Sequence, residues 1–136
     1  MIVRDIMSKN ITWVNEHDTV EKAAELMKSC DCGCIPVCNE DKLIGVVTDR
    51  DIALRSVAEG QSPHQRVRDV MSKDLVIGSP EMNVNDAVKI MGEKQIRRLP
   101  IVENDSLVGI VALGDISLEP VLQDNAEDAL KNISKP

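Results

Sequence analysis

The hydrophobic residues of this chain follow one pattern twice, and the second copy begins 64 residues after the first. In each copy a run of small or aliphatic residues ending in Met occupies positions i, i+3, i+4 and i+7, starting from Val20 and again from Val84. This spacing is typical of an amphipathic helix, and Thr19 and Asn83 stand where helix N-caps belong. A pair of strand-like apolar segments, separated by a polar turn, follows each helix. The predicted strands cover residues 34–38 and 43–48, and in the second copy residues 98–102 and 107–112.

A shorter strand-like segment precedes each helix, at 11–14 and at 75–77, and a last helix starts near Asp49 or Gly114. Each copy therefore predicts a β-α-β-β-α unit with a leading short helix, and the fold class is α/β (α+β) with two pseudo-symmetric repeats. Two copies favour one body over a solenoid, which needs about three or more stacked units. The predicted divisions are repeat 1 at 1–60, a linker at 61–66, repeat 2 at 67–122, and a terminal helix or tail at 123–136.

Composition narrows the possible functions. With 136 residues, one Trp and no Phe or Tyr, the chain is long enough for one domain whose core must be aliphatic. Its net charge of −7 and its lack of aromatic stacking platforms argue against a nucleic-acid polymer as partner. No apolar run approaches membrane-spanning length and the N-terminus does not resemble a signal peptide, so we expect a cytoplasmic protein with no membrane partner.

Two sequence motifs recur in register. The opening Arg-Asp-Ile-Met-Ser-Lys at 4–9 returns at 68–73 with Val in place of Ile. The strand Leu-Ile-Gly-Val-Val at 43–47 returns at 107–111 as Leu-Val-Gly-Ile-Val, and an Asp-Ile pair follows each strand. The repetition predicts two related clefts where the copies meet.

The candidate chemistry lies in the segment Gly-Val-Val-Thr-Asp-Arg-Asp at 45–51. A strand ends at Thr48 and a helix begins, so free backbone N–H groups there suit a phosphate. Asp51 lies on the same helical face, where its carboxylate can accept both hydroxyls of a ribose. The alternative is that Thr48 and Asp51 form a helix capping box, which needs no ligand. In the second copy Ala112 replaces Thr while Asp115 remains, which favours the ligand, although a first-turn Asp also suits the helix dipole.

These motifs resemble the cystathionine-β-synthase-type (CBS) domain, used in tandem as a Bateman module, over about residues 4–118. Residues 45–51 match the family's Gly-x-x-Thr-x-x-Asp signature, and the Ile-Pro-Val and Leu-Pro-Ile strands agree with it. The resemblance implies repeats packed sheet to sheet, adenosine-nucleotide clefts between them, and a homodimer. The ligand-binding residues that it implies are Thr48, Asp51, Asp115, Ile11, Thr12, Cys34, Ile35, Leu75, Val76, Arg98 and Leu99.

Basic residues offer a possible replacement for the hydroxyl that Ala112 lacks. Arg97 and Arg98 carry guanidinium groups, which suit phosphate, or they form a solvated strand end. Arg50 is a further phosphate candidate, but an exposed surface position explains it equally simply.

Four cysteines gather in the first copy, at 30, 32, 34 and 38. Their spacing matches no structural zinc pattern, so no metal ligands are assigned. Strand alternation would place Cys34 and Cys38 on one face, and a soft-metal or redox site is conceivable. The second copy has Ile96 and Val102 at two of the four positions, which favours core packing, because free Cys behaves as a small apolar residue.

Nothing in the sequence supports catalysis. His17 and His64 have no partner in sequence, and no phosphate-binding Gly-rich loop, nucleophile elbow or His-Glu metal motif is present. We therefore predict no enzyme and no catalytic cofactor, but a stand-alone CBS-pair sensor that binds AMP, ADP, ATP or a related compound and signals to a separate protein. The alternatives are a thiol- or metal-responsive protein that uses Cys30–Cys38, and a structural interaction module without a ligand.

Overall fold

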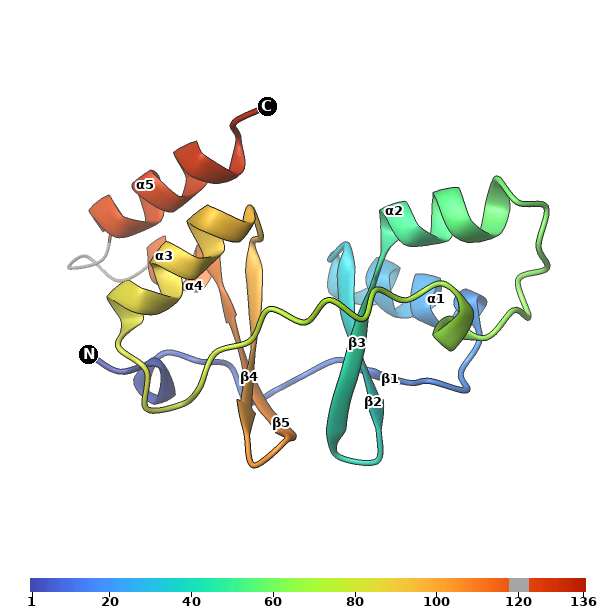
Figure 1. The fold of residues 1–136 in the computed structure, drawn as a ribbon, viewed down its shortest axis with the longest axis horizontal. Helices are drawn as coiled ribbons and strands as arrows, with labels where there is room; N and C mark the ends of the chain where they lie inside the picture. The colour runs from blue at the N-terminus through green and yellow to red at the C-terminus, as the bar shows by residue number, and fades with distance from the viewer. Residues whose placement is uncertain (118–122) are drawn as a thin grey trace. The chain divides into compact units, whose positions relative to one another are not determined.

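The computed structural model describes residues 1–117 and 123–136, and of residues 123–125 only the backbone (Figure 1). The chain forms two compact units. The continuous unit is Thr12–Leu75, and the discontinuous unit combines Met1–Ile11 with Val76–Pro136. Both units contain helices and strands, which confirms the mixed α+β class. The end of the predicted second repeat, at 118–122, lies outside the described residues.

The continuous unit builds a small sheet with helices from consecutive elements. Its strand β1 runs parallel to β2, and β2 runs antiparallel to β3. Helix α2 follows β3 directly and continues as a π-helical turn over Ala53–Val57, and a short 3-10 helix at Val67–Asp69 ends the unit. The elements are β1 (Val14–Asn15), α1 (Val20–Cys30), β2 (Cys34–Asn39), β3 (Lys42–Thr48) and α2 (Asp49–Ile52).

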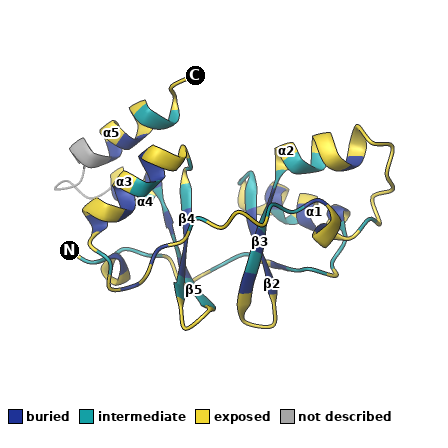
Figure 2. Cartoon of the chain, in the orientation of Figure 1, coloured by how far each residue is buried: buried dark blue, intermediate teal, exposed yellow. Residues whose placement is uncertain are grey.

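The discontinuous unit has the same order of long helix, two strands and short helix, but in its described residues no strand precedes the long helix and one additional helix follows. Strands β4 and β5 form an antiparallel pair, and α5 packs against α3 and α4. Its elements are a 3-10 helix (Val3–Asp5), α3 (Val84–Lys94), β4 (Arg98–Glu103), β5 (Ser106–Ala112), α4 (Leu113–Ser117) and α5 (Gln123–Ile133). In each unit buried residues occur on the long helix and on the strands, and consecutive residues of β2 and β4 are buried (Figure 2).

The two amphipathic helices and their caps are confirmed. The Thr19 hydroxyl oxygen accepts a hydrogen bond from the Lys22 N–H at 3.1 Å, and the Asn83 side chain accepts one from the Asn85 N–H at 2.8 Å. These caps satisfy N–H groups that the first turn of a helix leaves without an intrahelical partner.

The short segments before the helices form less strand than predicted. Only Val14–Asn15 pairs as β1 in the first copy, and 75–77 is not a strand. Instead, the Gly78 N–H donates to the Pro100 carbonyl oxygen and the Val102 N–H donates to the Gly78 carbonyl oxygen, each at 2.9 Å. Pairing stops there because Pro80, two residues later, has no N–H to donate.

Each copy's opening segment docks in the unit built by the other copy. The Val3 N–H donates to the Met82 carbonyl oxygen at 2.8 Å, and Val3 is fully buried in the core of the discontinuous unit. The Val67 N–H, 64 residues later, donates to the Asp18 carbonyl oxygen at 2.8 Å, and Val67 is buried in the continuous unit. The compact units therefore do not follow the sequence repeats, because the openings are exchanged reciprocally.

Candidate functional site

The turn between β3 and α2 forms a complete capping box. The Thr48 hydroxyl oxygen accepts a hydrogen bond from the Asp51 N–H at 3.0 Å, and an Asp51 carboxylate oxygen accepts one from the Thr48 N–H at 3.0 Å. The capping alternative is therefore present in the structure. It does not use all of the polar capacity of the turn, because the Thr48 hydroxyl keeps its own proton and the carboxylate has a second oxygen.

Arg55 is a basic neighbour of this turn that the sequence analysis did not single out. Its Nε lies 3.9 Å from the second Asp51 carboxylate oxygen, and its Nη1 donates to the carbonyl oxygen of Val70 at 3.2 Å. Arg55 therefore links helix α2 to the docked opening of the second copy. The spacing of an Asp and an Arg four residues apart on a helix was the signal that could have identified it.

The equivalent turn between β5 and α4 is built differently. Ala112 has no hydroxyl to offer, whereas the backbone hydrogen bond from the Leu113 N–H to the Arg97 carbonyl oxygen, at 2.9 Å, matches the bond from Asp49 to Gly33 in the first copy. Asp115 lies in the first turn of α4 and is partly buried. Among the residues that the structure describes, the Asp115 carboxylate has no hydrogen-bond or ion-pair partner.

The strand register brings one pair of predicted ligand residues together, and it places a further predicted residue opposite Ala112. Cys34 is the register partner of Thr48, and Arg98 is the register partner of Ala112. Each predicted residue in β2 or β4 thus lies beside the turn of its own unit.

The other predicted contact residues differ in exposure. Ile35 and Leu99 are fully buried in the cores of their units, so their side chains contact the core. Leu75 is exposed, and the three remaining residues are intermediate. Those three are Ile11, Thr12 and Val76.

The four cysteines divide into one disulfide-bonded pair and two that form no disulfide. Cys30 and Cys32 form a disulfide, and Cys38 is buried in β2. The pairing register of β2 with β3 shifts between Val37 and Cys38, where β3 has the extra residue Ile44, and the shared face of Cys34 and Cys38 stays a prediction. Burial, and secondarily the charge of Asp41, raises the pKa of the Cys38 thiol from 9.0 to about 11. Within residues 1–117 and 123–136, no group of three or more His, Cys, Asp or Glu side chains could hold a metal ion.

Comparison with known proteins decides the family. The CBS domain model matches residues 3–57 and again residues 67–121. The chain belongs to the CBS domain family. It is a tandem CBS pair, a regulatory type of module.

Relatives of this CBS pair match nearly its whole length. The CBS domain-containing protein YhcV of Bacillus subtilis is 46% identical over 132 residues, covering 97% of this chain and 94% of YhcV. The crystal structure of Hypoxic Response Protein I with two coordinated zinc ions is 33% identical with a TM-score of 0.80, covering 88% of this chain and 98% of that one.

A further structural neighbour is the CBS domain pair of protein MJ0100 in complex with 5′-methylthioadenosine and S-adenosyl-L-methionine. It has a TM-score of 0.75 and 24% identity, and the alignment covers 87% of this chain and 94% of that one.

In the part of this CBS pair that the structure describes, no helix is both long and apolar enough to cross a membrane.

Proposed function

We propose that this CBS pair is a cytoplasmic sensor that binds an adenosine nucleotide, or a related adenosine compound, at the Thr48–Asp51 turn and at its counterpart around Asp115. Asp51 and Asp115 would accept hydrogen bonds from ribose hydroxyls, and the Thr48 hydroxyl would donate to phosphate. The backbone N–H groups of residues 48–51 all have protein acceptors, so the prediction of free N–H groups at this turn is wrong. Cys34 and Arg98, the register partners of Thr48 and Ala112, would lie beside the bound ligand, whereas the fully buried Ile35 and Leu99 would offer it only backbone atoms.

The observation that carries the proposal is the carboxylate of Asp115, which has no partner among the described residues. Asp51 has a role in a capping box, but the residue three positions before Asp115 is Ala112, which has no hydroxyl to complete such a box. Capping therefore does not explain why both copies carry Asp at this position. A partly buried carboxylate gains most from a ligand that supplies hydrogen-bond donors, and a ribose diol supplies two.

The fold is compatible with such ligands, because the MJ0100 pair shares it and holds two adenosine compounds. Preferential binding to one conformation would shift the population of the module toward that conformation, which a protein partner would then recognise.

Self-association is supported by Leu54 and Val57, which follow α2 and are 49% and 70% exposed. Since these two apolar side chains lie three residues apart on one helical face and would be buried by a second copy, we propose a homodimer, which light scattering of wild type and Val57→Glu would test.

Calorimetric titration of the reduced protein with AMP, ADP, ATP and S-adenosylmethionine tests the proposed ligand. Asp51→Asn keeps an oxygen that can accept from the Thr48 N–H, so this variant removes charge while preserving the cap. Loss of a charged hydrogen bond costs about 1.5–3 kcal/mol, so we expect Asp51→Asn or Asp115→Asn to weaken micromolar binding by about tenfold or more. Asp86→Asn, at an exposed first-turn acid of α3, is the matched control and should bind normally. Absence of heat with all four compounds would contradict the proposal and favour a ligand-free interaction module.

A further inference from the structure

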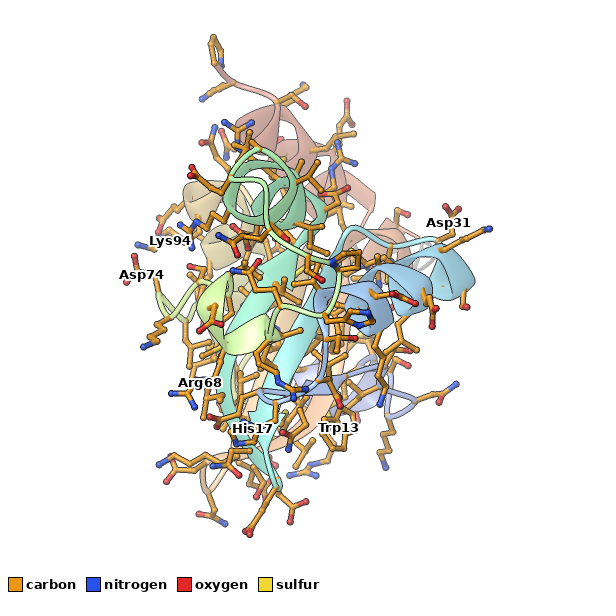
Figure 3. The ribbon with its side chains drawn as sticks, turned by 90° about the vertical axis from the view of Figure 1, so that its right-hand side faces the viewer. Trp13, His17, Asp31, Arg68, Asp74 and Lys94 are labelled. Atoms are coloured by element: carbon orange, nitrogen blue, oxygen red, sulfur yellow. A yellow bond between two sulfur atoms is a disulfide. The ribbon has the colours of Figure 1, made fainter. Side chains whose placement is uncertain are left out.

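The turn after helix α1 carries two cysteines that the proposed nucleotide site does not use. Cys30 is the last residue of α1 and is exposed, and Cys32 is partly buried against the core of the continuous unit. The residue between them, Asp31, projects away from the ribbon (Figure 3). The disulfide joins cysteines whose Cα atoms are 5.4 Å apart, inside the range of about 4.4–6.8 Å usual for this bond.

The backbone conformation of this turn does not depend on the cysteine side chains. Asp31 ends α1 in the left-handed conformation with φ 52°, and the Cys32 N–H donates to the Met27 carbonyl oxygen at 3.0 Å. In the second copy Gln95 has φ 56°, and the Ile96 N–H donates to the Met91 carbonyl oxygen at 3.0 Å.

The second copy forms that turn with Lys94 and Ile96 in place of the two cysteines. The backbone therefore holds positions 30 and 32 close together in either redox state. A thiol pair on this turn needs no rearrangement to become a disulfide, and the turn needs no disulfide to form.

The four cysteines also differ in accessibility. Cys30 is exposed at the end of a helix, whereas Cys38 is 2% exposed and its thiol is held in the protonated form by burial. A soluble thiol or disulfide reagent can therefore reach the Cys30 sulfur without unfolding the sheet, and it cannot reach Cys38 in this way.

We infer that Cys30 and Cys32 form a reversible redox modification site, a dithiol and disulfide pair that exchanges with low-molecular-weight thiols of the glutathione class. In reduction, a thiolate attacks the exposed Cys30 sulfur, the bond between Cys30 and Cys32 breaks, and Cys32 leaves as a thiolate. A second thiolate attacks the mixed disulfide, releasing Cys30 and the oxidised low-molecular-weight disulfide. Two electrons enter the protein and the two released thiolates take up two protons; oxidation is the reverse.

The pair lies close to the turn that carries Thr48 and Asp51. Gly33 follows Cys32 directly, and its carbonyl oxygen accepts a hydrogen bond from the Asp49 N–H at 3.0 Å. The redox site is thus one residue from a hydrogen bond to the first residue of α2. Its existence does not depend on whether a nucleotide binds there.

Redox titration followed by peptide mass spectrometry tests the inference. Folded protein is equilibrated in buffers of varied reduced and oxidised glutathione, quenched with acid, denatured, alkylated and digested with trypsin. All four cysteines fall in the peptide Ser29–Lys42. We expect this peptide to change from four alkylated cysteines to two, at Cys34 and Cys38, and to revert when excess reduced glutathione is added.

Variants assign the bond to its two sulfurs. Cys30→Ser and Cys32→Ser should each abolish the change, and both should fold, because the second copy builds the same turn without cysteine. The double variant Cys34→Ser/Cys38→Val should retain it. The inference is overturned if no internally bonded peptide forms at any ratio, if only glutathione adducts form, or if the change persists in Cys30→Ser.

Discussion

Gly45 and Gly109, which recur at the same place in the two copies, lie where the exchanged openings press against a strand. A Cβ at Gly45 would lie 2.8 Å from the backbone oxygen of Ser72, and one at Gly109 would lie 2.5 Å from the sulfur of Met7. The glycine of the family signature therefore allows the opening of the other copy to approach the strand closely.

We expect Gly45→Ala to lower the free energy of unfolding by about 1–3 kcal/mol, because backbone must move to admit the methyl group. Gly109→Ala should cost less, since the end of a methionine side chain can move aside. Gly114→Ala is the control, because no atom of the described residues lies within 4 Å of its added Cβ. Urea denaturation measures all three, and equal losses at 45 and 114 would contradict this explanation.

The ionisation of the Cys38 thiol makes the free energy of unfolding depend on pH. Its thiol has a raised pKa of about 11 in the folded protein against 9.0 without the fold, so the folded state holds the proton more tightly. This contribution is complete below pH 9 and is lost as pH rises through about 11. In Cys38→Val, which copies Val102 of the second repeat, we expect a shallower decline in the free energy of unfolding between these values. Urea denaturation at a series of pH values measures both proteins. If the free energy of unfolding fell equally with pH in wild type and variant, the effect would not come from Cys38.

At the scale of single elements, α2 and α4 provide a natural comparison. Helix α2 has a reciprocal cap between Thr48 and Asp51, and α4 begins after Ala112, which cannot accept such a bond. Comparing the two turns therefore separates the stability that the cap contributes from the effect of the Asp carboxylate, which both turns carry.

We expect Thr48→Ala to destabilise the chain by about 1 kcal/mol, since it removes the acceptor for the Asp51 N–H. Ala112→Thr should stabilise it by a similar amount or less, because Asp115 already occupies the position that completes the box. Chemical denaturation of the two variants checks both signs. A stability change of the same sign in both would show that the hydroxyl acts through something other than the cap.

The elements that sequence periodicity predicts well are those whose stability is local. The helices from Val20 and Val84 follow from apolar spacing and side-chain caps, and the signature turn follows from a strand meeting a helix. The register shift between Val37 and Cys38 and the single bridge at Gly78 depend on a neighbouring strand, which periodicity cannot detect. The predicted site residues stay a prediction, apart from the strand partnerships that place Cys34 beside Thr48 and Arg98 beside Ala112.

For the whole molecule, the exchanged openings predict which fragments fold. Residues 12–75 contain a complete core, including Val67 and Val70, whereas residues 1–60 lack these two buried side chains. We expect the 12–75 fragment to unfold cooperatively on heating and the 1–60 fragment to lack a cooperative transition, as seen by circular dichroism. Similar transitions in both fragments would show that the second opening is dispensable for this core.

The exchange also orders the steps of biosynthesis. A ribosome completes the continuous unit once Leu75 has emerged, and domains generally fold as units during synthesis. Met1–Ile11 is made before the continuous unit, but its packing partners lie in residues made after that unit, from Val76 onward. These eleven residues must therefore stay unpaired, with Val3 exposed, while the whole continuous unit is translated.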